Sequence, residues 1–221
     1  MKITHIYHSG FSVELSRSIL LFDWYRGALP DFDRTKTLYV FVSHRHPDHY
    51  SEQIWKLRES FPQIHYILYK GICKNPPCPV LAVRADESYT VRDLNLRTLL
   101  STDEGVAFVA TIEGHTIYHA GDLNLWYWQG EEEANKWQTG TYKAQINKLK
   151  GTVIDAAFLT LDPRQEHFAT LGMEYFLKNI SVRNVFPMHY WNEKQKAMAY
   201  LDTEALHPFR EKIRFEEKCL L

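Results

Sequence analysis

The segment from His44 to His49 gathers three histidines and an aspartate within six residues, as His44, His46, Asp48 and His49. Imidazole is the commonest metal ligand among side chains, and carboxylates join it in zinc, iron and manganese sites. A lone histidine would fit a polar turn equally well, but four donors this close together favour a metal site. The segment therefore predicts chemistry that depends on a divalent metal ion.

The neighbouring residues predict how this segment is held. The apolar run 37–42 directly precedes it and is typical of a buried strand. Apolar side chains at Ile54, Leu57 and Phe61 have the spacing of one helix face, with Ser51 as the N-cap. The donors are thus expected where a strand ends and a helix begins. In α/β folds this position is suited to chemistry, because the strand is rigid and the loop is free to vary.

Other apolar runs also end abruptly in polar residues that could face the same cleft. These polar endings are residues 101–105, 119–122, 162–164 and 187–189. Both halves of the chain begin with strands and finish with strand–helix–strand units, and no linker or repeat separates them. This layout predicts an α/β fold in which two sheets pack face to face with helices outside, a four-layer αββα sandwich, in a single domain spanning 1–221.

Composition narrows the class of protein. Apolar residues make up 45% and charged residues 24% of the chain, and the formal net charge is −1, so no basic surplus points to nucleic acid. No apolar run reaches the roughly 18 residues that a membrane helix needs, and no signal segment is evident at the start. Cys73, Cys78 and Cys219 are expected to be free thiols. We expect a soluble cytoplasmic protein and leave a homo-oligomer open.

The motif H-x-H-x-D-H resembles the signature of the metallo-β-lactamase-fold hydrolase superfamily. The later Gly121-Asp122 and the strand-end His189 match that family's Gly-Asp and late histidine. The sequence is most similar to the branch that contains ascorbate-6-phosphate lactonase, through the segments 8–11, 117–122 and 187–190. The resemblance covers the chain from about Ile3 to Tyr190.

The resemblance implies a centre with two divalent ions, of zinc, manganese or iron. The first ion would be bound by His44, His46 and a third ligand, which is usually a histidine in the family. Here the corresponding strand ends in Ser-Thr-Asp-Glu-Gly without a histidine. We expect Asp103 to replace it, with Glu104 as the second choice. A turn residue that merely caps the next segment is the alternative at this position.

The resemblance also implies the ligands of the second ion, which are Asp48, His49 and His189. Asp122 would bridge both ions, with a water or hydroxide between them. Two ions held about 3.5–4 Å apart can supply a hydroxide at neutral pH and stabilise the charge that develops as it attacks. Asp48 is additionally expected to accept a proton from the nucleophile, as the catalytic residue.

The activity implied by the resemblance is hydrolysis of an ester, a lactone or a phosphoester, with a small molecule, anionic or phosphorylated, as substrate. Arg164 is a candidate substrate anchor because a guanidinium pairs well with phosphate or carboxylate groups. His8 is a second candidate for lining the substrate cleft. The tryptophans at 126 and 128 fit a cleft wall, a subunit contact or plain core.

Two other functions remain open from the sequence. One is a phosphodiesterase-type hydrolase of the same fold. The other is a metal-binding scaffold without catalysis, for which the missing third histidine is the only support. Retention of Asp48, Asp122 and His189 argues against the scaffold.

Overall fold

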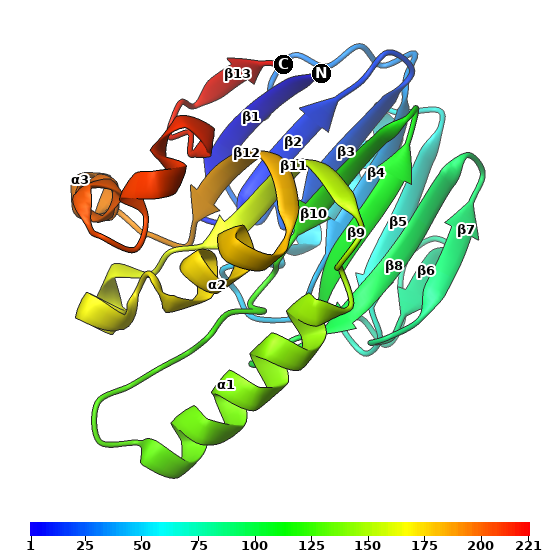
Figure 1. Ribbon diagram of the computed structural model, residues 1–221. Helices are drawn as coiled ribbons and strands as arrows, with labels where there is room; N and C mark the ends of the chain where they lie inside the picture. The colour runs from blue at the N-terminus through cyan, green and yellow to red at the C-terminus, as the bar shows by residue number, and fades with distance from the viewer.

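Two mixed β-sheets packed face to face form the body of the computed structural model, which describes residues 1–221 (Figure 1). The first sheet has seven strands. In spatial order they are β13 (Lys218–Leu220), β1 (Lys2–Tyr7), β2 (Gly10–Glu14), β3 (Ser18–Phe22), β4 (Thr37–Val42), β5 (Ile64–Tyr69) and β6 (Val80–Val83). The four from β3 to β6 are parallel neighbours.

The second sheet has six strands and joins antiparallel hairpins to a parallel trio. In spatial order they are β12 (Ser181–Met188), β11 (Val153–Thr160), β10 (His115–His119), β9 (Val106–Ile112), β8 (Leu94–Leu100) and β7 (Ser88–Val91). Glu113 and Gly114, with φ angles of 50° and 78°, form the two-residue turn between β9 and β10. A Glu-Gly pair between two apolar runs favours such a turn, and two left-handed residues are what a tight hairpin needs.

Helices cover the outer faces of both sheets. The first sheet carries the 3₁₀ helix η1 (Glu52–Glu59), and the second carries α1 (Glu132–Asn147) and α2 (Leu171–Asn179). A short helix, η2 (Pro163–Phe168), precedes α2. Three more follow β12 in the last part of the chain: α3 (Lys194–Ala199), η3 (Tyr200–Asp202) and η4 (His207–Lys212). The predicted four-layer αββα sandwich is thus confirmed. No helix has the length and apolar character required to cross a bilayer.

Alternation along the strands explains why the layers stack in this way. Val40 on β4 faces outward and packs in a cluster with Ile54 of η1, whereas Phe41 faces inward. The Phe41 ring meets that of Phe108 on β9 across the two sheets, with centroids 5.2 Å apart. This inner layer of large side chains fixes the distance between the sheets and so the spacing of the loops at their ends.

Several predicted elements differ in detail from the structure. The helix expected from Ser51 to Phe61 is a 3₁₀ helix from Glu52 to Glu59, although Ser51 does cap it by accepting from Gln53 N. Apolar residues at Tyr142, Ile146 and Leu149 have helical spacing and predict a helix that ends near Gly151, but the helix ends at Asn147. The tail from Ile213 to Leu221 has the pattern of a short last strand, but only Lys218–Leu220 forms one, because it pairs with β1 over just three residues.

The polar segments collect at one edge of the sandwich because the strands before them run parallel. β3 and β4 are parallel neighbours in the first sheet, and β10, β11 and β12 are parallel neighbours in the second. Their carboxyl ends therefore lie at the same edge, as is common for sites in α/β folds. The turn between β1 and β2, which contains His8, reaches the same edge.

Candidate metal centre

The first group of possible metal ligands consists of His44, His46 and Asp122, whose donor atoms all lie within 4.8 Å of one another. His44 follows β4 directly, and Asp122 follows β10. His44 Nε2 lies 3.0 Å from His46 Nδ1 and 3.5 Å from Asp122 Oδ2. His44 and Asp122 are buried, while the side chain of His46 is 42% exposed. This group therefore opens toward solvent on the His46 side.

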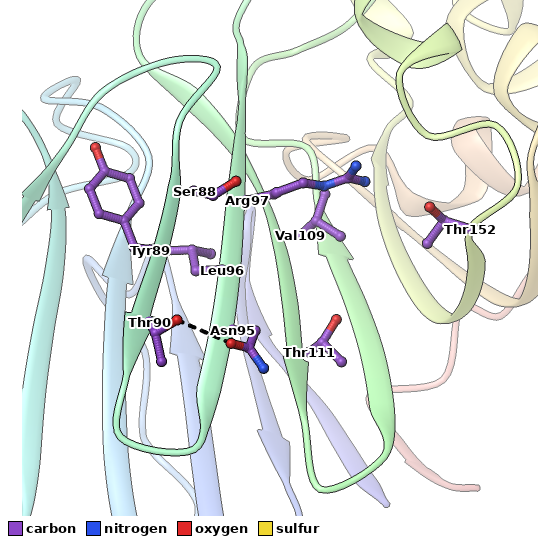
Figure 2. A pocket seen from close by; sticks show the side chains of 9 residues that line it. All are labelled: Ser88, Tyr89, Thr90, Asn95, Leu96, Arg97, Val109, Thr111 and Thr152. Carbon is purple, nitrogen blue, oxygen red and sulfur yellow. Dashed lines mark hydrogen bonds between the residues drawn. The ribbon is translucent and has the colours of Figure 1, made fainter.

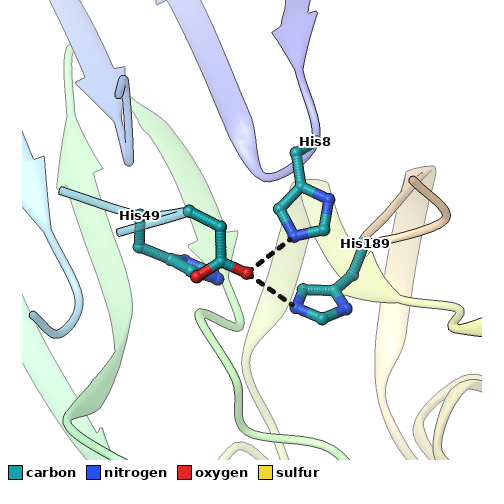
Figure 3. A group of neighbouring side chains, drawn as sticks. His8, His49 and His189 are labelled. Carbon is teal, nitrogen blue, oxygen red and sulfur yellow. Dashed lines mark ion pairs between the residues drawn. The ribbon is translucent and has the colours of Figure 1, made fainter. Parts of the chain in front are cut away.

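The second group consists of His8, Asp48, His49 and His189, and its donor atoms meet the same 4.8 Å limit. Figure 3 shows the three imidazoles arriving from different segments of the chain and turning toward one place. Asp48 Oδ2 lies 3.4 Å from His8 Nε2 and 4.0 Å from His189 Nε2. All three histidines are buried. This group is consequently more enclosed than the first.

Asp122 lies between the two groups. Its Oδ2 faces His44, whereas its Oδ1 lies 3.3 Å from His49 Nε2 and 3.5 Å from His189 Nε2. The rings of His44 and His49 are only 4.1 Å apart between centroids. The two groups are therefore adjacent, consistent with a binuclear metal site, and Asp122 occupies the place that a bridging carboxylate requires. Its bridging role itself stays a prediction.

Asp23, at the end of β3, orients the histidines of both groups. Its Oδ2 accepts from His49 Nδ1 at 2.8 Å and from Ser43 Oγ at 2.6 Å, and its Oδ1 accepts from Ser43 N at 2.8 Å. Since the Ser43 hydroxyl donates to Asp23, it accepts from His44 Nδ1, 2.9 Å away. Both imidazoles thus direct Nδ1 to a hydrogen-bond acceptor and turn Nε2 toward the centre. Carboxylates behind ligand histidines commonly fix the tautomer in this way.

Asp162 performs the same task for His189. Its Oδ2 accepts from His189 Nδ1 at 2.9 Å, which leaves Nε2 free to face the second group. Arg164 also donates to Asp162, through Nε at 2.9–3.0 Å and through Nη2. Burial alone would raise the pKa of Asp162, but the hydrogen bonds from His189 and Arg164 outweigh it and lower that pKa to about 2. The Asp162 carboxyl group is therefore ionised at neutral pH and only accepts hydrogen bonds.

The second group and Asp122 present buried polar atoms that have no hydrogen-bond partner. They are His8 Nδ1 and Nε2, His49 Nε2, His189 Nε2 and Asp122 Oδ1. An unpaired buried polar atom costs about 1–3 kcal/mol, so five close together call for an explanation. A divalent cation would satisfy most of them at once, because neutral imidazoles and carboxylates are the donors it prefers. The residues present therefore fit the metal that the motif implies.

The protonation states of His44, His8 and Asp122 also suit metal binding. Burial, together with the neighbouring His49, lowers the pKa of His44 to about 4, and burial lowers that of His8 to about 4. Burial would raise the pKa of Asp122, but the charges of His49 and His189 hold it well below its usual range. His44 and His8 are consequently neutral and Asp122 is ionised at neutral pH, which are the forms that bind cations.

Asp103 and Glu104, the two candidates for the third ligand of the first ion, lie on different sides of the His46 ring. Asp103 Oδ2 is 3.9 Å from His46 Nδ1, the atom that faces His44. Glu104 Oε2 is 3.3 Å from His46 Nε2, on the outer side, and Glu104 also pairs with Arg45. The geometry favours Asp103. Its donor atoms nevertheless fall outside the first group, so its role as a ligand stays a prediction.

A cleft of about 410 Å³ opens onto both groups. Three tryptophans, Trp126, Trp128 and Trp191, form its apolar wall. Arg164 lines it beside them, with its guanidinium carbon 5.1 Å from the centre of the Trp191 ring and half of its side chain exposed. Of the interpretations left open for the aromatic segment, the cleft wall agrees with this position. Arg164 is placed where it could contact a substrate, and that role remains untested.

Left-handed backbone conformations gather around the centre. His8, Asp23, His189 and Trp191 have φ angles of 55°, 43°, 66° and 51°. A residue with a side chain seldom adopts such angles, at a cost of about 1–3 kcal/mol each. Each of these residues stands immediately after a strand or within the turn that follows one. The backbone is bent there to aim side chains at the centre.

Sequence reasoning assigned His8 to substrate contact and did not assign roles to Asp23 and Asp162. The structure places His8 among the possible ligands of the second ion and the two aspartates behind the histidines. A signal for both aspartates was present, since each ends an apolar run just as the ligand segments do. Their partners, 26 and 27 positions further along the chain, could not be paired with them without the fold.

A second hollow, of about 430 Å³, lies on the face of β7, β8 and β9 and is as large as the cleft (Figure 2). Its walls are hydroxyl, amide and apolar side chains, with Arg97 as the only charged one. Thr90 donates to Asn95 across it at 3.2 Å. It offers neither a cluster of titratable groups nor a metal-ligating set, so the chemistry is assigned to the cleft at the strand ends.

Comparisons with known proteins support the fold. No family model matches the chain, and no curated protein is significantly similar to it in sequence. Among solved structures, Igni18, a metallo hydrolase from the archaeon Ignicoccus hospitalis, superposes with a TM-score of 0.68 at 16% identity, over 100% of this chain and 98% of its own. The metallo-β-lactamase fold protein YhfI from Bacillus subtilis gives 0.59 at 14% identity, covering 90% and 92%.

The same fold also carries different chemistry. CmlA, a diiron β-hydroxylase from Streptomyces venezuelae, superposes with a TM-score of 0.67 at 10% identity, over 100% of this chain but only 53% of its own. At such low identities the similarity concerns the fold and does not decide between hydrolysis and oxidation. Two mixed sheets with flanking helices and these matches show that the chain has the metallo-β-lactamase fold.

Proposed function

We propose that this protein is a metal-dependent hydrolase that binds two divalent ions side by side at the strand ends. The observation that carries the proposal is the convergence of five buried, unpartnered nitrogen and oxygen atoms on adjoining His/Asp groups. The likeness of the H-x-H-x-D-H segment to a hydrolase signature supports hydrolysis over other metal chemistry. Divalent ions bound there would polarise a carbonyl or phosphoryl oxygen and make water nucleophilic at neutral pH.

The chain's own residues would hold the ions and keep the ligands oriented. In this proposal His44, His46 and Asp103 bind the first ion, and Asp122 bridges to the second. Asp23 orients the ring of His49 directly and that of His44 through Ser43, and Asp162 orients His189, so that each of these three rings turns its Nε2 toward the ions. Rotation of these rings would break hydrogen bonds to buried carboxylates, so the ligands are fixed before any substrate arrives.

Asp48 has two possible tasks at the second ion, as a ligand and as a proton acceptor. Burial would raise its pKa, but contact with His8 and the charge of His49 outweigh this and lower the pKa below its usual range. An acid this strong binds a cation well and holds a proton poorly. The ligand role is therefore the stronger part of the proposal, and the base role predicted from the sequence is the weaker part.

Lactones of phosphorylated sugar acids are the first substrate class to test, since the segments 8–11, 117–122 and 187–190 resemble the lactonase branch. Phosphodiesters are the second. Arg164 could anchor an anionic group of either class, because its hydrogen bonds to Asp162 use Nε and Nη2 and leave Nη1 free. The tryptophan wall would pack against the apolar part of the substrate.

The test combines metal analysis with a substrate screen. Elemental analysis of the purified protein should find bound zinc, manganese or iron. A panel of lactones and phosphodiesters is then assayed with added Mn²⁺ or Zn²⁺. His46→Ala should lower kcat/KM by at least about 100-fold, since even loss of a group behind a ligand costs 10–100-fold.

The matched control is Arg45→Ala, at the neighbouring position, where the side chain is 70% exposed and pairs only with Glu104. It should retain near wild-type activity. Absence of metal from the wild-type protein, or full activity in His46→Ala, would refute the proposal.

A further inference from the structure

His8 differs from the other buried histidines in its hydrogen bonding. His5 engages both ring nitrogens, with His8 O at 3.1 Å and Tyr190 Oη at 3.0 Å. His119 does the same, with Ser9 O at 2.9 Å and Gly121 N at 3.1 Å. Both nitrogens of His8 are buried and have no hydrogen-bond partner, although its side chain is 0% exposed. A histidine that served only packing would not need to leave both of them unpaired.

The free nitrogen of His8 faces the second group at ligand spacing. His8 Nε2 lies 3.4 Å from Asp48 Oδ2, and the His8 and His189 rings are 4.2 Å apart between centroids. Two donors at about 2.1 Å from one tetrahedral ion lie about 3.4 Å from each other. The 3.4 Å between His8 and Asp48 is therefore a separation at which both atoms can bind one ion, whereas the 4.0 Å between Asp48 and His189 requires a small closure.

The turn that carries His8 is built to keep the ring in place. Its carbonyl oxygen accepts from His189 N at 3.5 Å, which ties the β1–β2 turn to the end of β12. The ring lies 4.3 Å from that of Trp191 between centroids, and the backbone takes the left-handed φ of 55°. A strained backbone that is bonded to the opposite sheet indicates that the direction of this side chain matters.

We propose that His8 is a further protein ligand of the second ion, beside Asp48, His49, His189 and the bridging Asp122, so that the two halves of the centre differ in how they hold metal. The inference rests on the proposed function. The second group then closes around its ion with His8, Asp48, His49 and His189. The first group has three donors, one of them on the half-exposed His46. The second ion should therefore be retained, while the first exchanges with solvent and offers the open position that a substrate needs.

The experiment is a Zn²⁺ titration of metal-free protein against a competing chromophoric chelator. The wild type should show one tight and one weaker site, and dialysis against metal-free buffer should leave one ion bound. His8→Gly suits the left-handed φ and removes the ligand. It should weaken the tight site by at least about 100-fold, more than the loss of a group behind a ligand.

Two further variants separate a ligand from a packing residue. His8→Phe keeps a ring against Trp191 but cannot bind metal, so it should weaken the tight site as much as His8→Gly does. His115→Gln, at the opposite end of β10 from Asp122, should leave both sites unchanged. Wild-type affinity in either His8 variant would overturn this inference alone. A wild-type protein that binds no Zn²⁺ would overturn it together with the proposed function.

Discussion

At the scale of single residues, the centre depends on carboxylates that would not touch the metal. Asp23 receives three hydrogen bonds, from Ser43 N, Ser43 Oγ and His49 Nδ1. Through Ser43 it also sets the tautomer of His44, so one buried side chain controls a ligand in each group. Its pKa is lowered in spite of complete burial, because His49 donates to it and His119 and His49 lie close.

Replacing Asp23 by asparagine should damage the centre without changing its volume. Whichever way the amide turns, its NH₂ group faces a donor, either Ser43 N or the pair Ser43 Oγ and His49 Nδ1. We expect metal affinity to fall by about 10–100-fold, measured by titration with Zn²⁺. Asp33→Asn is the control, since that carboxylate is exposed and accepts only from Thr35. Equal affinity in the Asp23 variant and the control would contradict the assigned role.

Residue types alone were sufficient to find the donors but not their support. Four donors within six residues indicate a metal site directly, and the position of His189 after an apolar run indicates a further ligand. Asp23 reads as the last residue of a strand, and nothing in the sequence pairs it with Ser43, 20 positions later. The role of His8 was equally hidden. Its side chain is directed inward by a left-handed conformation at His8 itself, and the sequence does not show that a histidine adopts it.

At the scale of elements, the loop between β8 and β9 is packed against the start of the metal-binding segment. Val106 N donates to Ser43 O at 3.1 Å, which joins the two sheets beside His44. Gly105, with φ of +80°, lies so close that an added Cβ would stand 2.1 Å from Ser43 O and 2.6 Å from His44 Cβ. The backbone there has no room for any side chain.

Gly105→Ala should therefore destabilise the metal-free protein by more than about 3 kcal/mol, from left-handed strain and overpacking together. Gly151→Ala is the matched control, because its φ of +83° imposes the same strain while no atom lies within 4 Å of its added Cβ. Gly151→Ala should lower the free energy of unfolding by only about 1 kcal/mol. Urea unfolding followed by tryptophan fluorescence measures both. Similar losses in the two variants would show that the close approach at Ser43 is unimportant.

Elements with strong apolar periodicity were predictable, and weakly patterned ones were not. The strands at 37–42 and 106–112 coincide with continuous apolar runs, which leave little choice of where a buried strand begins and ends. β7 (Ser88–Val91) was missed, since it is a short edge strand without buried residues. The segment after the ligands has a helical apolar spacing, yet it forms a 3₁₀ helix, a distinction that periodicity over two turns cannot make.

At the scale of the whole molecule, the centre joins the two sheets. His44, Asp48 and His49 follow a strand of the first sheet, whereas Asp122 and His189 follow strands of the second. An ion bound by both sets would act as a cross-link between halves that are otherwise held mainly by apolar packing. Metal binding and global stability should thus be coupled.

Removal of metal should consequently lower the stability of the entire protein. Free metal at 100 times its dissociation constant stabilises a folded protein by about 2.7 kcal/mol. Addition of EDTA should lower Tm by several degrees in a calorimetric scan, and excess Zn²⁺ should restore it. EDTA already saturated with Zn²⁺ is the control and should have no effect. An unchanged Tm would show that the two sheets do not depend on the ion.

The left-handed backbone at His8, Asp23, His189 and Trp191 bears on how this protein could evolve or be engineered. A selection for heat resistance alone would reward glycine or asparagine at these positions, because each relieves torsional strain. Every such gain would erase a ligand, its support or part of the cleft wall. Thermostabilised descendants that keep these side chains should therefore acquire their improvements elsewhere, and these positions should be held fixed in any stabilising library.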